Sequence, residues 1–279
     1  MVRLHKSRGI IARIRLLGWS ENDVSKRIFK LMDGETILED PKSTLDWRFG
    51  NRLKIELDDP KGEEIYFGRL GKIGREHVHE VYNEVKKEFI VSPGQPSASH
   101  SNFIVYPKEN LIVFEERADI KIKKFISVFA HMYLKAFQDL SRILIEPISE
   151  PYTLSQIQKD FEKIVEVDLH VVRSNPESDP EFQPIEKILH ETGSSEWSTK
   201  FQNPREGLKA DSPIIKGGIK LSSEGYGDYK IVAMKGEQRR EFISVEQAIK
   251  IVVEGVDEPI EVAKALAKEL VKWLRGRRK

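Results

Sequence analysis

The chain has 279 residues, of which 39% are hydrophobic and 33% charged, so it is long enough for one large core or two smaller ones under a heavily ionised surface. Cysteine is absent, which excludes disulfides, thiolate metal sites and cysteine nucleophiles. No apolar run of about eighteen residues occurs, so no membrane-spanning helix is expected. The basic N-terminal stretch MVRLHKSRG lacks the apolar segment of a signal peptide, and we expect a cytoplasmic protein. Abundant Lys, Glu and Arg without Cys also fit a thermophilic source.

The net charge of +1 hides an uneven distribution of charge along the chain. Residues 1–30 carry eight cations against two anions, and residues 257–279 carry seven cations against four anions. Residues 145–197 carry twelve anions against four cations. Such asymmetry bears on partners rather than on fold: basic ends suit phosphates, whereas an acidic middle suits a basic protein partner or a solvated surface.

Residues 1–91 predict an N-terminal β-α-β-β-α unit. Residues 10–19 alternate apolar and cationic positions, which is the periodicity of a strand, and a helix follows them. Residues 52–73 predict two strands around a Pro-Gly turn. The apolar side chains of residues 75–89 recur at helical spacing.

Residues 92–101, SPGQPSASHS, predict a linker, and residues 102–244 predict a central α+β domain. The hairpin 103–114 is apolar on both faces of each strand, which indicates central strands covered on both sides. A strongly amphipathic helix is expected over 120–140.

The later elements complete the fold class. In chain order they are a strand at 143–148, a helix at 154–164, a strand at 165–173, a short helix at 182–190, an irregular excursion at 193–218 and short strands over 219–244. Residues 245–279 predict two C-terminal helices, at 245–255 and 259–275. The expected fold is therefore α+β, with two α/β layers of mainly antiparallel sheets and a C-terminal helical segment.

Carboxylates at the end of the hairpin raise the question of a metal-dependent nuclease, which needs several acids aimed at one divalent ion. Glu115 and Glu116 are neighbours on a strand, so their side chains should point to opposite faces, and Asp119 follows them. Asp58 and Asp59 precede a Pro-Gly turn, which indicates a loop. A nuclease that uses Asp58, Asp59, Glu115 and Glu116 is kept as the alternative hypothesis.

The histidines favour no metal or cofactor site. His77 and His79 are two residues apart in a predicted helix, where their side chains diverge. His170 shares an outward strand face with Asp168, and this pair suits either acid–base chemistry or a solvated sheet face. We therefore expect no cofactor and no catalytic residue.

Three glycines in YFGRLGKIGREH, residues 66–77, suggest a loop that binds an anion. A strand is expected to end at Phe67 and a helix to begin near Gly74, so Arg69, Lys72 and Arg75 would surround free backbone amides. The alternative is a strand end softened by glycine.

The last predicted helix is the strongest candidate for nucleic-acid contact. Its cations recur at three- or four-residue steps and continue into the C-terminus: Lys264, Lys268, Lys272, Arg275, Arg277 and Arg278. Such a stripe neutralises backbone phosphates without reading bases. Glu261 and Glu269 lie among the cations, so an ordinary solvated helix face is the alternative. Arg13 and Arg15 would add a second contact patch.

Three segments carry a resemblance to a known family: the hairpin FIVYPKENLIVFEE, the step VVRSNPESD, and the hairpin GYGDYKIVAMKG with the Ser-initiated segment after it. They resemble an uncharacterised prokaryotic domain-of-unknown-function family that is found near anti-phage defence genes. The likeness spans roughly residues 60–245, and its motifs are structural. The resemblance implies a helper subunit in defence against foreign nucleic acid, for example the missing N-terminal and linker half of a truncated prokaryotic Argonaute.

Together these observations predict a non-enzymatic accessory subunit that binds the backbone of DNA or RNA and forms a heterodimer with a protein partner. Two other functions stay open. One is the nuclease effector described above, and the other is a purely structural assembly protein with no affinity for nucleic acid.

Overall fold

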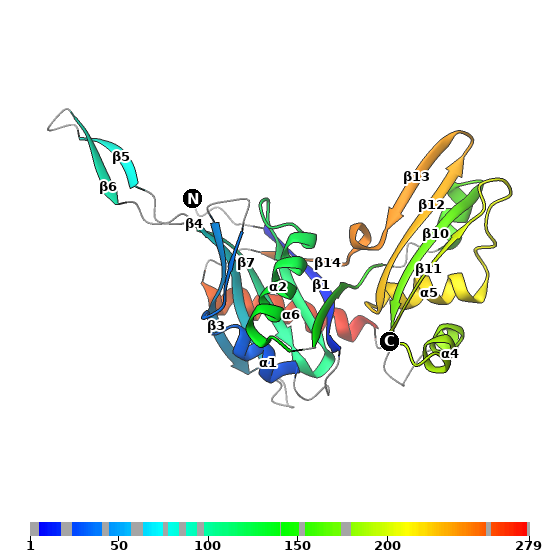
Figure 1. The fold of residues 1–279 in the computed structure, drawn as a ribbon, viewed down its shortest axis with the longest axis horizontal. Helices are drawn as coiled ribbons and strands as arrows, with labels where there is room; N and C mark the ends of the chain where they lie inside the picture. Colours follow the sequence, from blue (N-terminus) through cyan, green and yellow to red (C-terminus); the bar gives the residue numbers. More distant parts are fainter. Residues whose placement is uncertain are drawn as a thin grey trace.

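The computed structural model confirms the predicted fold class: two mainly antiparallel sheets, helices packed on them, and a helix at the C-terminal end (Figure 1). The residues that the structure describes are 6–17, 24–40, 45–56, 64–74, 78–83, 88–93, 98–139, 141–150, 154–173, 180–254 and 258–277. None of the helices in this part of the chain combines the length and the apolarity needed to cross a bilayer.

Eight strands form the first sheet, in the order β14-β1-β8-β7-β4-β3-β2, with β9 also paired to β1. Their bounds are Lys6–Leu17 (β1), Ile37–Glu39 (β2), Leu45–Glu56 (β3), Glu64–Gly74 (β4), Ala98–Tyr106 (β7), Leu111–Glu116 (β8), Arg142–Pro147 (β9) and Lys250–Glu254 (β14). All these pairings are antiparallel. A short 3-10 turn, η2 (Pro107–Glu109), joins β7 to β8.

β1 lies inside this sheet and has three partners. Its residues 8–13 pair with β8, and on the opposite edge residues 6–10 pair with β14 and residues 12–17 pair with β9. The linker predicted over 92–101 is wrong at its C-terminal end, because β7 begins at Ala98 and its residues 98–101 already pair with β4. The predicted N-terminal, central and C-terminal segments therefore contribute strands to one sheet.

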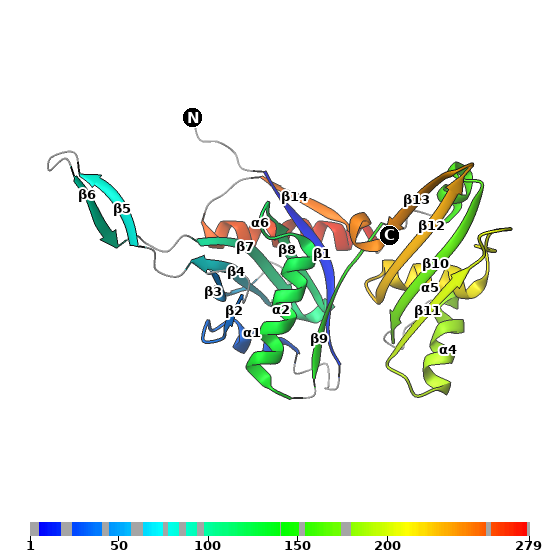
Figure 2. The same ribbon diagram turned by 45° about the horizontal axis from the view of Figure 1, so that its top comes forward.

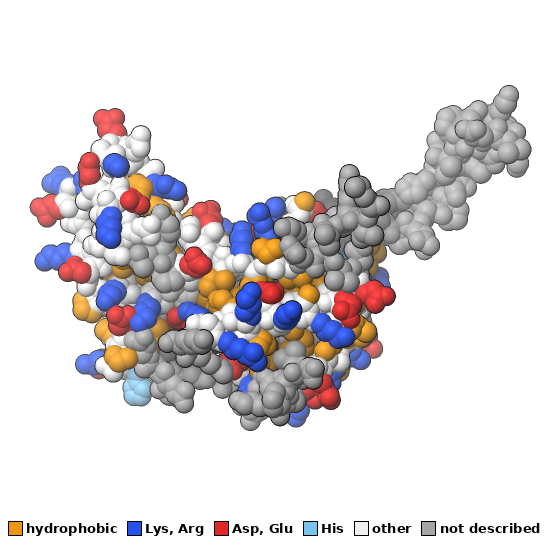
Figure 3. All heavy atoms as spheres, turned by 180° about the vertical axis from the view of Figure 1, so that it is seen from behind, with side chains coloured by type: hydrophobic (Ala, Val, Ile, Leu, Met, Phe, Trp, Pro, Cys, Tyr) orange, Lys and Arg blue, Asp and Glu red, His pale blue; other side chains and the backbone are white. Residues whose placement is uncertain are grey.

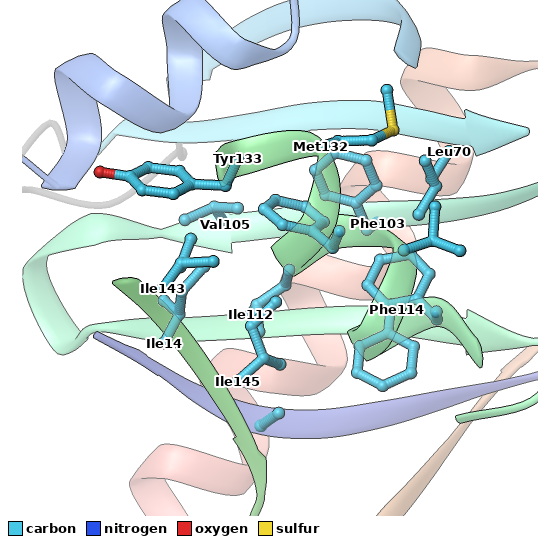
Figure 4. Close-up of a cluster of buried hydrophobic side chains, with 14 of the residues drawn as sticks. Ile14, Leu70, Phe103, Val105, Ile112, Phe114, Met132, Tyr133, Ile143 and Ile145 are labelled. Atoms are coloured by element: carbon cyan, nitrogen blue, oxygen red, sulfur yellow. The ribbon is translucent and has the colours of Figure 1, made fainter. Parts of the chain in front are cut away.

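Both faces of this sheet are apolar, because successive side chains of each strand point to opposite sides. On one face lie Phe103 and Phe114, which belong to the buried cluster in Figure 4. They pack with Phe125 of α2 (Ile122–Phe137), and the ring centroids of Phe114 and Phe125 are 4.1 Å apart. The short α1 (Val24–Leu31) lies on the same face. On the other face, Ile104 and Val113 pack with α6 (Pro259–Arg277). Figure 2 shows α2 and α6 on opposite sides of the sheet, so the prediction of central strands covered on both faces is confirmed.

The second sheet has four antiparallel strands in the order β11-β10-β12-β13. Its elements are α3 (Leu154–Asp160), β10 (Lys163–Val172), η3 (Pro180–Phe182), α4 (Gln183–Glu191), β11 (Glu196–Gln202), α5 (Pro213–Ser223), β12 (Gly227–Lys235), β13 (Gln238–Ile243) and η4 (Ser244–Gln247). The helices bury one face of this sheet, where Val167 and Leu169 of β10 meet Ile215 and Ile219 of α5. The outward residues of β10, such as Asp168 and His170, lie on the face opposite these helices.

The helix predicted over 75–89 is wrong. The chain forms the strands β5 (Val78–Asn83) and β6 (Glu88–Pro93), which pair as a separate two-stranded sheet. This stretch is rich in valine and aromatic residues, which favour strands, and in this hairpin that preference outweighs the helical spacing. The helix predicted over 245–255 is also wrong, because the β-branched run in β14 pairs with β1 instead.

The irregular excursion predicted over 193–218 contains β11 and the first half of α5. Two adjacent glycines, which are typical of loops, led to the wrong prediction for this helix, but the packing of α5 requires them. A Cβ on Gly218 would lie 2.5 Å from Leu169 Cδ1, and a Cβ on Gly217 would lie 2.4 Å from the carbonyl oxygen of Glu181. Glycine therefore lets α5 approach β10 and η3 closely.

Candidate nucleic-acid interface

The cationic face of α6 is built by the burial of its other side. Val262, Leu266 and Leu270 are buried against the sheet, and alanines between them let the helix lie close to it. A Cβ on Gly9 of β1 would lie 3.1 Å from Leu266 Cδ2, so glycine leaves room for α6 there. The outward side then carries four exposed cations: Lys264, Lys268, Lys272 and Arg275. Figure 3 shows Lys and Arg side chains gathered across the band that α6 occupies.

Two acids lie within this stripe and pair with two of its four cations. Lys264 Nζ is 3.2 Å from Glu261 Oε1, and Lys272 Nζ is 3.6 Å from Glu269 Oε2. Among the described residues, no acid lies within ion-pair distance of Lys268 or Arg275. The stripe therefore keeps two unpaired cations, and its two ion pairs are on the surface.

Arg277 is already engaged within the molecule. Its Nη2 is 2.5 Å from Glu224 Oε1, in the turn between α5 and β12, and its guanidinium lies 5.0 Å from the centroid of the Trp273 ring. This ion pair joins the end of α6 to the second sheet. Arg278 and Arg75, two of the predicted contact residues, lie outside the described residues.

Arg13 and Arg15 lie at the junction of the two sheets rather than on an open surface. Arg13 Nε donates to the carbonyl oxygen of Glu224 at 3.0 Å, and Arg15 Nη1 donates to that of Arg173 at 2.9 Å. Both guanidinium groups lie over the Tyr226 ring, at 4.5 and 4.7 Å from its centroid. Burial, and then the positive charge of Arg13, lower the pKa of Arg15 to about 10, although Tyr226 and Glu146 oppose the shift. The two arginines hold the sheets together.

The strand end predicted at Phe67 is wrong, because β4 continues through Gly74, so the expected anion-binding loop does not form over residues 68–74. Gly68 has a packing role instead: its Cβ would lie 2.7 Å from Phe103 Cζ. Arg69 and Lys72 have opposite strand parity and thus lie on opposite faces of the sheet. Arg69 donates to Asn102 Oδ1 at 2.9 Å on the α6 side. Lys72 Nζ lies over the Trp47 ring on the α2 side and donates to the carbonyl oxygen of Asp119 at 2.8 Å.

The hairpin carboxylates diverge. Glu115 is 2% exposed, and its Oε2 accepts hydrogen bonds from Asn102 Nδ2 and Arg117 Nη2, both at 2.7 Å. Glu116 points to the other face, with its Oε2 3.4 Å from Lys250 Nζ. Asp119 accepts a hydrogen bond from the Ser99 hydroxyl. Each acid has its own partners, and no group of three or more potential metal ligands occurs in the described part of the chain. Asp58 and Asp59 fall outside that part.

His170 is the centre of a charged cluster that sequence reasoning did not assemble. The expected neighbour was Asp168, but the cross-strand neighbour of His170 is Asp228 on β12, whose Oδ2 is 3.6 Å from Nδ1. Glu196 Oε2 of β11 is 3.2 Å from Nε2. The Asp228 and Glu196 carboxylates outweigh partial burial and raise the pKa of His170 to about 9, so the ring is protonated at neutral pH.

Glu146 of β9 extends this cluster toward the first sheet. It lies opposite Arg13 on β1 and is half-buried. Burial, and then the negative charge of Asp228, raise the pKa of Glu146 to about 7, although His170 and Arg15 oppose the shift. Strand parity in RILIEP would have placed Glu146 on the face opposite Ile143 and Ile145. No local pattern in the sequence predicts that the second sheet lies against that face of β9.

A family model described as "Domain of unknown function (DUF4747)" matches residues 11–272. None of the curated proteins matches the chain. The matched region includes strands of both sheets and α6 as far as Lys272, and the description of the family assigns no activity to any of these residues.

Proposed function

This chain belongs to the DUF4747 family, and we propose that it is a non-enzymatic subunit that binds the phosphate backbone of DNA or RNA through the outward side of α6. One observation carries the proposal. Lys264, Lys268, Lys272 and Arg275 are all exposed along one side of a helix whose other side is fixed on the sheet. Charges held in this way need no ordering of a loop when a polyanion binds.

The spacing of the stripe suits contacts to several phosphates. A helix rises about 1.5 Å per residue, so the four cations lie at steps of about 4.5–6 Å and span about 16 Å from Lys264 to Arg275. Cations placed in a line neutralise phosphates along a strand and release counterions, and they read no base edges. Binding of this kind depends strongly on salt and little on sequence.

The two glutamates within the stripe do not prevent its lysines from binding phosphate. The Lys264–Glu261 pair is 58% and 48% exposed, and the Lys272–Glu269 pair is 77% and 31% exposed. Exposed pairs of this kind contribute about 0–1 kcal/mol, so a phosphate can compete with the glutamate for its lysine. Lys268 and Arg275 have no such competitor among the described residues.

The test is the salt dependence of binding by a variant with Lys268→Gln and Arg275→Gln. Fluorescence anisotropy with labelled DNA and RNA, at several salt concentrations, gives the slope of log K against log salt. Removal of two backbone contacts should reduce the steepness of this slope on a duplex by about 1.8. The loss of affinity should be similar for unrelated sequences, and a loss confined to one sequence would contradict backbone binding.

A matched control lies on the opposite face of the same sheet. Lys123 and Lys135 are exposed on α2, so Lys123→Gln with Lys135→Gln changes the net charge by the same amount. We expect its affinity to stay within about twofold of that of the unmodified chain. Equal effects of the two variants would show that net charge alone drives binding, and α6 would then not be the site.

The protein partner and the defence setting are part of the proposal. Residues 145–197 carry twelve anions against four cations, which supports a partner with a basic surface. The resemblance described above favours a truncated Argonaute as that partner. Size-exclusion chromatography of the purified chain with a truncated prokaryotic Argonaute tests this, and separate elution at micromolar concentration and low salt would exclude the pair.

A further inference from the structure

We infer that the α6 face takes double-stranded nucleic acid, held by its two backbones, in preference to single strands held by their bases. This inference rests on the proposed function and names its substrate class. The two modes of binding need different surfaces: single-strand binders stack bases on exposed aromatic rings, whereas duplex binding without sequence preference needs only correctly placed cations.

The described surface offers no open aromatic ring. Every aromatic side chain whose burial the structure describes is buried or half-buried. Several half-buried rings are covered by a guanidinium: Phe29 by Arg52 at 4.6 Å, and Tyr226 by both Arg13 and Arg15. Several of the half-buried rings therefore already have a stacking partner.

Trp273 is the aromatic residue of α6, and its ring is also covered by a guanidinium. It packs partly against the core beneath the helix, and its ring is capped by the guanidinium of Arg277, 5.0 Å from the ring centroid. Arg277 is itself anchored to Glu224 Oε1 at 2.5 Å. A base that stacked on Trp273 would have to displace an arginine held by an ion pair.

The shape of the site also favours a duplex. α6 packs across one face of the first sheet with its buried side, so its four exposed cations form a line that is fixed to that sheet. A hollow near η4 is lined by Glu150, Glu246 and Lys250 without any α6 residue, and its net negative charge does not suit a polyanion. This hollow therefore gives a single strand no path along the stripe.

Charge density distinguishes the two substrates further. A duplex carries one charge per about 1.7 Å of axis, and a single strand carries one per about 3.4 Å. A fixed line of about 16 Å therefore meets about twice as many phosphates on a duplex, with both strands of a groove within reach. The rigid stripe gains from this density without any adjustment of its own.

The experiment compares four probes of equal length, each about two helical turns long: duplex DNA, duplex RNA, an unstructured DNA strand and an unstructured RNA strand. The duplexes should bind about tenfold more tightly than the strands at low salt. With four cations engaged, duplex affinity should fall roughly 150-fold between about 50 and 200 mM salt. The Lys268→Gln, Arg275→Gln variant should show a fall of only about twelvefold over the same range.

A second variant, Trp273→Leu, reports on stacking and keeps apolar contact with the core. Duplex affinity should change by less than about twofold. If single strands bind as tightly as duplexes, or if Trp273→Leu weakens single-strand binding by about fivefold or more, the duplex inference is overturned and the proposed backbone function stands. If no probe binds in dilute salt, or if the α6 variant binds all probes unchanged, both are overturned.

Discussion

His170 on β10 lies directly across from Asp228 on β12, with Nδ1 3.6 Å from Oδ2, and Glu196 on β11 approaches its other ring nitrogen. Arg142 of β9 forms an ion pair with the same Glu196. The protonated ring thus links three strands of the second sheet to the edge of the first. The junction between the sheets depends on charge as well as on the stacking of Arg13 and Arg15 with Tyr226.

The first prediction concerns the stability contributed by protonated His170. Its pKa in the folded protein, about 9, lies above the ordinary value of 6.5, so the contribution is fully present below about pH 6.5 and is lost as pH rises through about 9. The side chains of His170 and Asp228 are 30% and 60% exposed, so solvent screening limits the contribution to about 1 kcal/mol. His170→Asn should lower the free energy of unfolding in urea by about that amount at pH 6 and by little at pH 10. An exposed histidine on α4 gives the control His190→Asn, and an equal loss at both pH values for His170→Asn would refute the account.

The second prediction concerns Glu146, whose burial works against its ionisation. Its pKa is raised from 4.5 to about 7, so the carboxyl favours the folded state below about pH 4.5, and this contribution is lost as pH rises through about 7. Glu146→Gln stays neutral and should therefore be more stable than the unmodified chain by about 1 kcal/mol at pH 8, after allowance for its half-exposed position. Thermal unfolding at pH 5 and pH 8 measures the difference. The exposed Glu246→Gln should show no such gain, and destabilisation by Glu146→Gln at pH 8 would show that the ionised carboxylate is needed at the junction.

The third prediction tests the close contact between α5 and β10. A Cβ on Gly218 would lie 2.5 Å from Leu169 Cδ1 and 3.3 Å from Ile185 Cδ1. The clash should cost about 1–3 kcal/mol, more than the roughly 1 kcal/mol gained in helix propensity when glycine becomes alanine. Gly276→Ala in α6 is the matched control, because nothing lies within 4 Å of its added Cβ, and it should be neutral or slightly stabilising. A stable Gly218→Ala protein would mean that α5 can move away from β10 at little cost.

The sequence predicted the features that depend on near neighbours in the chain. The two strands at 103–114 are apolar at every position, and the helical spacing of the cations from Lys264 to Arg275 is local, so both were found. β5 and β6 were missed because short apolar segments fit either periodicity. α5 was missed because Gly217 and Gly218, which look like loop residues, serve packing against another element.

The junction could not be read from the sequence because its members meet only through long-range pairing. Glu146, His170, Glu196 and Asp228 come from four strands of two sheets. His170 meets Asp228 through the register of β10 and β12, and Glu146 meets both only where β9 leaves the first sheet beside the second. Arg13 and Arg15 looked like an open cationic face for the same reason, since the turn that covers them lies more than 200 residues away in sequence.

The last prediction separates a structural carboxylate from a catalytic one. Glu115 and Glu116 are adjacent, but Glu115 is buried against Asn102 and Arg117, whereas Glu116 meets Lys250 at the surface. Glu115→Ala leaves a buried amide and a guanidinium without their acceptor and should lower the free energy of unfolding by about 3 kcal/mol. Glu116→Ala removes one partly exposed pair and should cost less than about 1 kcal/mol.

The two variants bear on the nuclease alternative as well, because that hypothesis gives both glutamates the same role. Urea denaturation should separate the variants clearly, and incubation of the unmodified chain with labelled strands and duplexes in Mg²⁺ or Mn²⁺ should yield no cleavage products. Metal-dependent cleavage that both substitutions abolish, with stability unchanged in each, would support the nuclease. For that outcome the two carboxylates would have to face one ion from opposite sides of a sheet, which the pairing of Glu115 with Arg117 and of Glu116 with Lys250 opposes.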